Sequence, residues 1–181
     1  MTNLKLTDDI LEAVSSGFKK QLNFTKELVR FPSLRGFEID AQNFVYKALK
    51  ERGYEMVRWA IDIKDIEGHT GFSPVNIDYS NAVNVVGTHT PNIDNGKSLI
   101  LNAHIDVVPE GPLSMWKGSP YNPTIDGDWM YGRGAADMKA GLAANIFALD
   151  ALRSLGYQPA GKVFLQSVVE EECTGNGALS C

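Results

Sequence analysis

SLILNAHID, at residues 98–106, decides the fold because it is a short apolar run that ends in polar side chains. Residues 98–103 follow the turn-forming segment Pro91–Gly96 and are mostly apolar, as is typical of a buried central strand. His104 and Asp106 come directly after this strand. In open α/β sheets, ligand sites lie outside the carboxyl ends of the strands. The stretch therefore predicts a sheet and a candidate site together.

Two further polar groups follow predicted elements in a similar way. An apolar strand over Lys162–Val169 ends at three consecutive glutamates, Glu170 to Glu172. Asp137 follows the loop Gly132-Arg133-Gly134 and opens a helix that the sequence predicts over Asp137–Leu155. Two of the three groups lie at strand ends and the third lies at a helix start nearby. We therefore expect all three to converge on one site.

The rest of the chain alternates helical and extended patterns. Such alternation predicts an α/β sheet with helices packed on its faces. The other predicted elements are helices over Asp8–Arg30 and Ile39–Arg52, strands over Tyr54–Ile63 and Asn81–His89, a hairpin within Thr124–Tyr131, and loops over Asp62–Ser80 and Pro109–Pro123.

The composition narrows the class of protein. The chain has 181 residues, of which 44% are hydrophobic and 22% charged, as expected for one globular domain. Its net charge of -5 gives no basic stripe for a phosphate backbone, so nucleic acid is not an expected partner. No apolar run is long enough to cross a bilayer, no membrane partner is expected, and the first residues lack a signal-peptide pattern. Two cysteines do not suggest a disulfide framework, which favours a cytoplasmic location.

A histidine surrounded by carboxylates suits zinc, whose sites take imidazole nitrogen and carboxylate oxygen. On an extended strand, His104 and Asp106 point to the same face, so Asp106 can orient His104 through its second ring nitrogen. Asp137 is a candidate to bridge two metal ions, which such sites hold about 3.5–4 Å apart. One glutamate of the acidic run can bind metal while its neighbour serves as the general base.

Each signal also has a simpler interpretation when taken alone. The three glutamates can be a solvated loop, and His104 with Asp106 can be a core or surface pair. Gly132-Arg133-Gly134 can be a plain turn, and a nucleotide-binding domain built on it lacks the second half of a dinucleotide fingerprint. His69 and His89 are expected to be solvated rather than ligands.

The stretch Leu101–Gly141 closely resembles the M20 metallopeptidase family, and residues 170–177 look like the acidic motif of that family. The resemblance covers nearly the whole chain, more weakly before residue 80. It implies an α/β fold, namely a zinc-peptidase-like catalytic domain with a mixed sheet and helices on both faces. The family includes acetylornithine deacetylase, succinyl-diaminopimelate desuccinylase and glutamate carboxypeptidase.

The resemblance also implies a role for each site residue. His104 matches the ligand of one metal ion, Asp106 the residue that orients it, and Asp137 the carboxylate that bridges both ions. Glu171 matches the general base and Glu172 the ligand of the other ion, with two zinc or cobalt ions per complete catalytic domain. The triple glutamate leaves a choice of one residue in this register.

Members of the family are longer than this chain. Residues 1–181 therefore match the N-terminal part of the metal-binding catalytic domain, truncated before a further acidic ligand, a final histidine ligand and the lid domain through which the full-length protein would form a homodimer. We expect weak metal binding and little activity from these residues alone.

The expected activity is zinc-dependent hydrolysis of the amide bond of an N-acyl amino acid, of the deacetylase or desuccinylase type. The alternatives are a dipeptidase or carboxypeptidase of the same family acting on a short peptide, and a non-catalytic fragment with an incomplete metal site.

Overall fold

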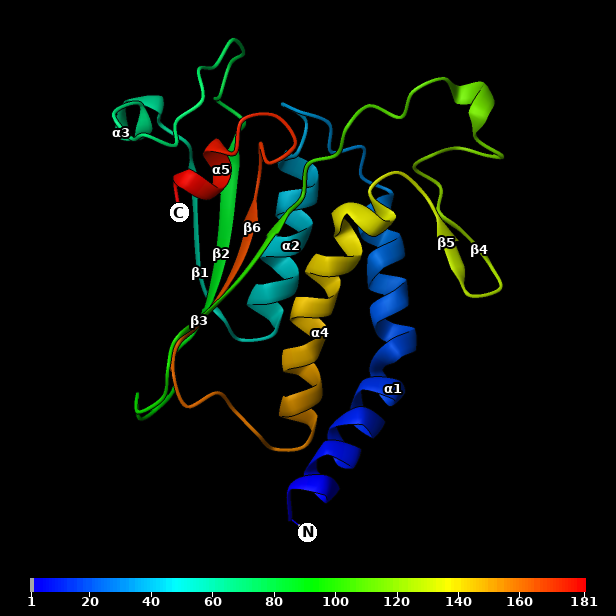
Figure 1. Cartoon of the computed structure of the whole chain (residues 1–181), viewed down its shortest axis with the longest axis vertical. Helices are drawn as coiled ribbons and strands as arrows, with labels where there is room; N and C mark the ends of the chain where they lie inside the picture. Colours follow the sequence, from blue (N-terminus) through cyan, green and yellow to red (C-terminus); the bar gives the residue numbers. More distant parts are fainter. Residues whose placement is uncertain (1) are drawn as a thin grey trace.

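A computed structural model describes residues 2–181 and contains a four-stranded mixed sheet (Figure 1). The strand order is β1-β2-β6-β3. β2 pairs antiparallel with both β1 and β6, whereas β3 and β6 run parallel, with Leu99 opposite Val163 and His104 opposite Val168. The strands are β1 (Glu55–Ala60), β2 (Val83–His89), β3 (Leu99–His104) and β6 (Val163–Val168).

Two long helices cover one face of the sheet, and a third packs outside them. α2 contacts β1 and β2, α4 contacts β3 and β6, and α1 packs against α4. In Figure 1 all three lie on the same side of the sheet, with α1 outermost. The helices are α1 (Thr2–Val29), α2 (Ile39–Glu51), α3 (Ile63–Ile66), α4 (Ala140–Ser154) and α5 (Asn176–Leu179); the shorter elements are the turns η1 (Leu113–Met115) and η2 (Ala135–Lys139) and the hairpin β4 (Thr124–Asp126) with β5 (Trp129–Tyr131).

The core lies between the sheet and these helices. Leu165 and Ala103 of the sheet face the helices, where Leu49, Leu142 and Ile146 are almost completely buried. Full burial of an aliphatic side chain of this size stabilises the fold by roughly 1.5–3 kcal/mol. This apolar layer fixes the sheet on α2 and α4, and so fixes the strand ends.

The opposite face of the sheet is open over β3 in the described part of the chain. Ile100 of β3 is 59% exposed, and Asn102 donates a hydrogen bond to Gln166 across this exposed face at 2.9 Å. The mixed α/β class is confirmed: the long helices lie on one face, and on the other the short helix α5 lies at the end of β2, where Asn84 donates hydrogen bonds to the Gly177 carbonyl and the Ser180 hydroxyl. β3 is an edge strand of this sheet, not the central strand that its apolar sequence predicted. An apolar run does not specify what covers each face, because burial is decided by distant segments.

The helix predicted from Asp137 begins later, at Ala140. Asp137 itself has an extended backbone (φ -117°, ψ 103°) within the irregular turn η2. Gly134 introduces this turn with a φ of 75°, and a Cβ at that position would lie 2.4 Å from Val107. The glycine therefore lets the loop approach the chain just beyond β3, which brings Asp137 to the end of the sheet.

No helix among the described residues is long and apolar enough to span a membrane.

Candidate metal centre

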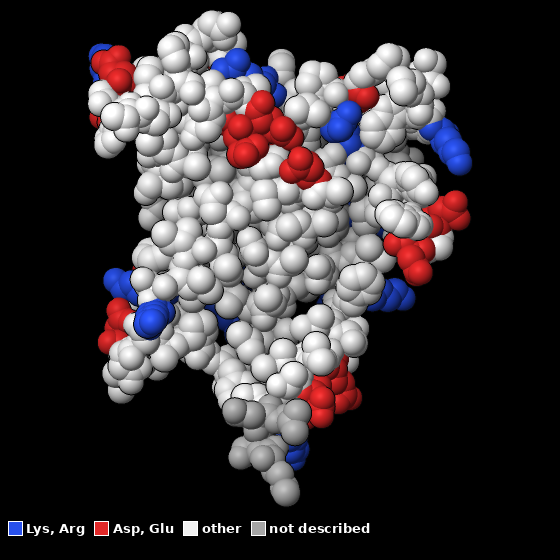
Figure 2. Space-filling model, viewed as in Figure 1, with Lys and Arg blue, Asp and Glu red and all other residues white. Residues whose placement is uncertain are grey.

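The three predicted polar groups meet at one end of the sheet. β3 ends at His104 and β6 ends at Val168, and these two residues pair in the parallel register. The carboxyl ends of the two strands are therefore adjacent, and η2 brings Asp137 to them. His104 Nε2 lies 3.1 Å from Asp137 Oδ1. In Figure 2 acidic side chains gather in the upper middle of the view, over the upper ends of β6 and α4.

His104, Asp137 and Glu172 form a group that can hold a metal ion. One ligand atom from each of the three lies within 4.8 Å of the others. Imidazole nitrogen and carboxylate oxygen are donors that zinc accepts, so the donor chemistry fits such an ion. The group consists of the three residues that the sequence analysis expected as metal ligands.

His104 is buried, and both its ring nitrogens face oxygen atoms. Nδ1 lies 2.9 Å from the backbone carbonyl oxygen of Asp106 and 3.6 Å from the carboxylate of the same residue. Burial lowers the pKa of His104, but the hydrogen bonds and negative charges of Asp106 and Asp137 outweigh burial and raise it to about 9. Asp106 thus contacts the second ring nitrogen as expected, although its backbone carbonyl makes the close contact.

The Asp106 carboxylate makes further contacts besides the one to His104. Its two oxygens accept hydrogen bonds from the backbone N–H of Glu171 at 3.3 Å and of Glu172 at 3.0 Å. Asp106 lies beyond the end of β3, and its carboxylate still lies 3.6 Å from His104 Nδ1. Asp106 is 2% exposed. Its carboxylate links the end of β3 to the segment that follows β6.

We call residues 170–172 the glutamate turn, and its three side chains lie in different surroundings. Glu170 is buried, whereas the Glu171 side chain is 53% exposed, with Oε2 lying 3.8 Å from His104 Nε2. Glu172 belongs to the metal-binding group, and burial together with the negative charge of Asp137 raises its pKa. Of the three, Glu172 groups with His104 and Asp137, and Glu171 lies beside His104.

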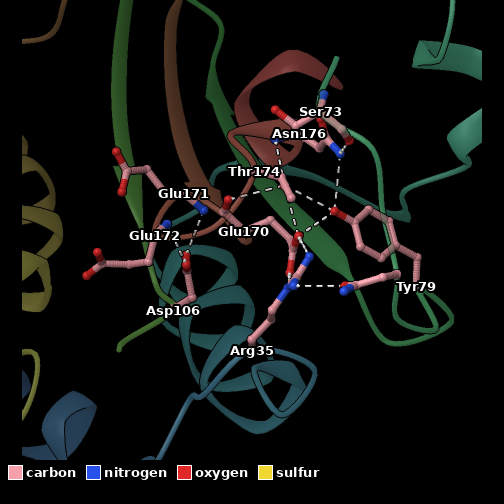
Figure 3. Close-up of polar contacts among 10 residues, drawn as sticks. Arg35, Ser73, Tyr79, Asp106, Glu170, Glu171, Glu172, Thr174 and Asn176 are labelled. Carbon is pink, nitrogen blue, oxygen red and sulfur yellow. Dashed lines mark hydrogen bonds and ion pairs between the residues drawn. The ribbon is translucent and has the colours of Figure 1, made fainter. Parts of the chain in front are cut away.

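The sequence did not indicate the partners of Glu170. Arg35 donates two hydrogen bonds to its carboxylate, and Tyr79 and Thr174 donate to it as well (Figure 3). Burial raises the pKa of Glu170, but these donors and the charge of Arg35 lower it below its usual value. Arg35 and Tyr79 lie far from the glutamates in sequence. The sequence offered one indication of such a partner, namely that a carboxylate buried in the fold needs a cation beside it.

The histidines and the glycine loop outside the centre have other roles. His69 is exposed, as expected. His89 is buried and its Nε2 lies 3.1 Å from the Pro159 carbonyl oxygen, so the expectation that it is solvated is wrong. Arg133 donates a hydrogen bond to the Pro109 carbonyl, and Gly134 packs against Val107, which makes the glycine loop a close packing element.

A buried histidine beside carboxylates, at the strand ends of a mixed α/β sheet, is an arrangement that fits a metal-binding site. Residues 100–181 match the family model described as Peptidase family M20/M25/M40. The chain belongs to this family.

Curated relatives extend the similarity over the whole chain. It is 31% identical over 189 residues to N-formyl-4-amino-5-aminomethyl-2-methylpyrimidine deformylase of Halalkalibacterium halodurans, covering 100% of the chain and 39% of that protein. It is 31% identical over 160 residues to succinyl-diaminopimelate desuccinylase of a Bradyrhizobium species, covering 87% of the chain and 38% of that protein. The chain thus spans about two fifths of the length of these relatives.

Solved structures share the fold. A di-peptidase from Saccharomyces cerevisiae superposes with a TM-score of 0.76 at 18% identity, over 94% of this chain and 36% of that one. An M20 family metallo-carboxypeptidase from Sulfolobus solfataricus superposes with a TM-score of 0.65 at 24% identity, over 84% of this chain and 31% of that one. The zinc-peptidase-like fold expected from the sequence is therefore confirmed.

Proposed function

We propose that this chain forms part of a metal-dependent amidohydrolase that removes the acyl group from an N-acyl amino acid. The observation that carries the proposal is the group of His104, Asp137 and Glu172, whose ligand atoms lie within 4.8 Å of one another at the strand ends. We assign His104 and Glu172 to separate ions and Asp137 to the bridging position. Two zinc or cobalt ions would, when bound, polarise the amide carbonyl and lower the pKa of a water molecule.

The remaining residues handle the proton and the geometry. Glu171 is half-exposed and lies beside His104 Nε2, so its carboxylate is free to take a proton from the attacking water. It returns this proton to the nitrogen of the leaving amine as the carbon–nitrogen bond breaks. Asp106 holds the backbone of Glu171 and Glu172, which keeps the base and the ligand at fixed positions relative to His104.

The curated relatives favour an acyl-amide substrate over a peptide. Both relatives above are named for removing an acyl group, formyl in one and succinyl in the other. The dipeptidase and carboxypeptidase likenesses are below 25% identity and support the fold alone. We therefore propose a small N-acyl amino acid as the substrate of the full-length protein, and a homodimer in the cytoplasm as its working form.

A zinc titration tests the centre on this chain directly. Calorimetry with Zn²⁺ should detect binding to the wild-type chain, and His104→Ala should abolish it. His69→Ala, at an exposed histidine outside the centre, is the matched control and should bind Zn²⁺ like the wild type. If the two variants bound Zn²⁺ equally well, His104 would not be a ligand.

An activity assay on the full-length protein tests the reaction. Amine release should be faster from N-formyl, N-acetyl or N-succinyl amino acids than from dipeptides. Glu171→Gln should keep its metal and lose roughly 10²–10⁴-fold in turnover, which is the usual contribution of a general base. Near-normal turnover in that variant would contradict the assignment of the base, and a preference for dipeptides would contradict the substrate class.

A further inference from the structure

We propose that Arg35 is a positioning residue, which places Glu171 and Glu172 by holding Glu170 on the far side of the glutamate turn. The inference rests on the proposed function, because the placement of Glu171 and Glu172 matters through the metal centre. Arg35 touches neither the metal-binding group nor the base in the structure, and acts through Glu170.

The carboxylate of Glu170 is fully engaged on the side away from the metal centre. Arg35 Nε donates to Oε1 at 2.6 Å and Arg35 Nη2 donates to Oε2 at 2.9 Å, which is a two-pronged ion pair. Thr174 donates to Oε2 at 2.9 Å, and the Tyr79 hydroxyl also donates to this oxygen. With its side chain 1% exposed, Glu170 serves as an anchor within the protein.

The backbone of Glu170 is fixed as firmly as its side chain. Its φ of 66° lies in the left-handed region, which is unfavourable for a residue with a side chain and persists where surrounding contacts enforce it. Its carbonyl oxygen accepts hydrogen bonds from the N–H of Thr174 at 3.0 Å and of Gly175 at 2.8 Å. Because contacts hold both the side-chain carboxylate and the backbone carbonyl of Glu170, they also fix the direction in which the chain continues to Glu171.

That direction determines where the next two side chains point. The N–H groups of Glu171 and Glu172 face the Asp106 carboxylate, so the turn is clamped between Asp106 on one side and Arg35 on the other. Figure 3 shows Glu170 pointing toward Arg35 and Tyr79, while Glu171 and Glu172 point the opposite way. A shift of Glu170 would therefore move the base and the ligand together.

Arg35 is suited to this role because its own segment is bound to the end of β3. The Ser33 hydroxyl donates to the Ile105 carbonyl at 2.6 Å, and the Val107 N–H donates to the Ser33 carbonyl at 2.9 Å. Leu34 and Val107 form a parallel bridge. The segment 33–35 thus contacts the end of β3 through Ser33 and the turn after β6 through Arg35, which fixes the spacing of the two ligand-bearing ends.

Loss of the guanidinium would leave Glu170 as a buried carboxylate without a cation. Breaking such a pair by removing one partner is unfavourable, and we expect the Glu170 carboxylate to shift toward water as a result. Glu171 and Glu172 follow in the chain and would move with it. We expect the Zn²⁺ affinity to fall, since changes in residues that orient metal ligands typically cost 10–100-fold in affinity.

The test compares Zn²⁺ binding by the metal-free chain in four forms: wild type, Arg35→Gln, Arg35→Lys and Arg52→Gln. Arg52 also forms an ion pair with a carboxylate, because its Nε donates to both oxygens of Asp150, at 2.9 Å and 3.1 Å; these side chains are 22% and 29% exposed and lie between α2 and α4. We expect Arg35→Gln to weaken Zn²⁺ binding roughly 10–100-fold. Arg35→Lys should recover part of this, because it keeps the charge but not the planar fork. Arg52→Gln should lower stability and leave the affinity unchanged.

A second measurement does not depend on metal. In ¹H–¹⁵N spectra of the metal-free chain, the amide signals of Glu171 and Glu172 should shift in Arg35→Gln and stay in place in Arg52→Gln. If Arg35→Gln fails to fold, the milder Arg35→Lys carries both comparisons.

The outcomes separate the two proposals. Unchanged Zn²⁺ affinity and unchanged Glu171 and Glu172 signals in the Arg35 variants would overturn the positioning role. Equal losses of affinity in Arg35→Gln and Arg52→Gln would also overturn it, because the effect would then be one of general stability. A wild-type chain that does not bind Zn²⁺ would contradict the metal centre itself, and the amide signals would then decide whether Arg35 positions the turn.

Discussion

Replacing Glu38 with glutamine should stabilise the chain relative to the wild type. This gain in the free energy of unfolding should be larger at pH 8 than at pH 5. Glu38 precedes α2 and is 1% exposed. Burial raises its pKa from 4.5 to about 7; backbone hydrogen bonds at Glu38 and Gly36 oppose this, and the charges of Asp106 and Glu170 add to it. A folded-state pKa above the unfolded value means that the folded chain holds the proton more tightly. Stability therefore falls as the pH rises from 4.5 to 7.

The size of the effect follows from these two pKa values. At 1.36 kcal/mol for each pH unit between them, ionised Glu38 costs the fold about 3 kcal/mol above pH 7. Glu38→Gln keeps the shape of the side chain, and Glu38 Oε2 has no hydrogen-bond partner among the described residues, so little is lost there. The variant should be close to wild type at pH 5 and more stable by up to about 3 kcal/mol at pH 8.

Urea unfolding of the metal-free chain at both pH values measures this difference. Glu12→Gln, at an exposed position on α1, is the control and should show no pH-dependent difference from the wild type. If Glu38→Gln differed from wild type by the same amount at pH 5 and pH 8, the argument from the burial of this carboxyl would be refuted.

Three further changes have defined outcomes. Gly134→Ala should destabilise the chain by about 2–4 kcal/mol in thermal unfolding, because the new Cβ meets Val107 at 2.4 Å and φ is positive; Gly156→Ala, with φ 78° and open space, should lose only the backbone part. Asp106→Asn should weaken Zn²⁺ binding roughly 10–100-fold by calorimetry, since its amide NH₂ cannot accept a hydrogen bond from the glutamate turn, and an unchanged affinity would argue against the clamp. Tyr54→Phe should be neutral or stabilising by up to about 1 kcal/mol, because the buried Tyr54 hydroxyl has no partner in the described part of the chain; a marked loss of stability would show an interaction not identified.

The location of the candidate metal ligands could be predicted, because the local sequence indicates where each strand ends. His104 and Glu172 follow apolar strands, and the rule that sites form at the carboxyl ends of parallel strands brings them together. Asp137 was also expected near the strand ends, at the start of a helix, but the irregular turn that begins at Gly134 and places it there was not predicted. The assignment of metal and base roles to these residues stays a prediction until metal binding is measured.

The supporting residues could not be predicted, because their partners are distant in sequence. Arg35 lies in a loop after α1, and nothing near it indicates that it binds Glu170, 135 residues away. Glu38 resembles an ordinary residue at a helix start, yet it is fully buried. The edge position of β3 in this sheet was not predicted either. Which strands pair with β3 depends on segments distant in sequence, such as β6.

The parallel pairing of β3 with β6 has a consequence for folding kinetics. The two strands are joined by residues 105–162, which include the hairpin and α4, so closing this pair brings together segments far apart in the chain. Non-local closure of this kind loses loop entropy before its contacts form, and it slows folding. A chain in which β3 has formed but β6 has not yet paired holds His104 without Glu172. During refolding, zinc uptake would therefore follow the pairing of β3 with β6. It would occur later than helix formation, and its rate would report on the pairing step.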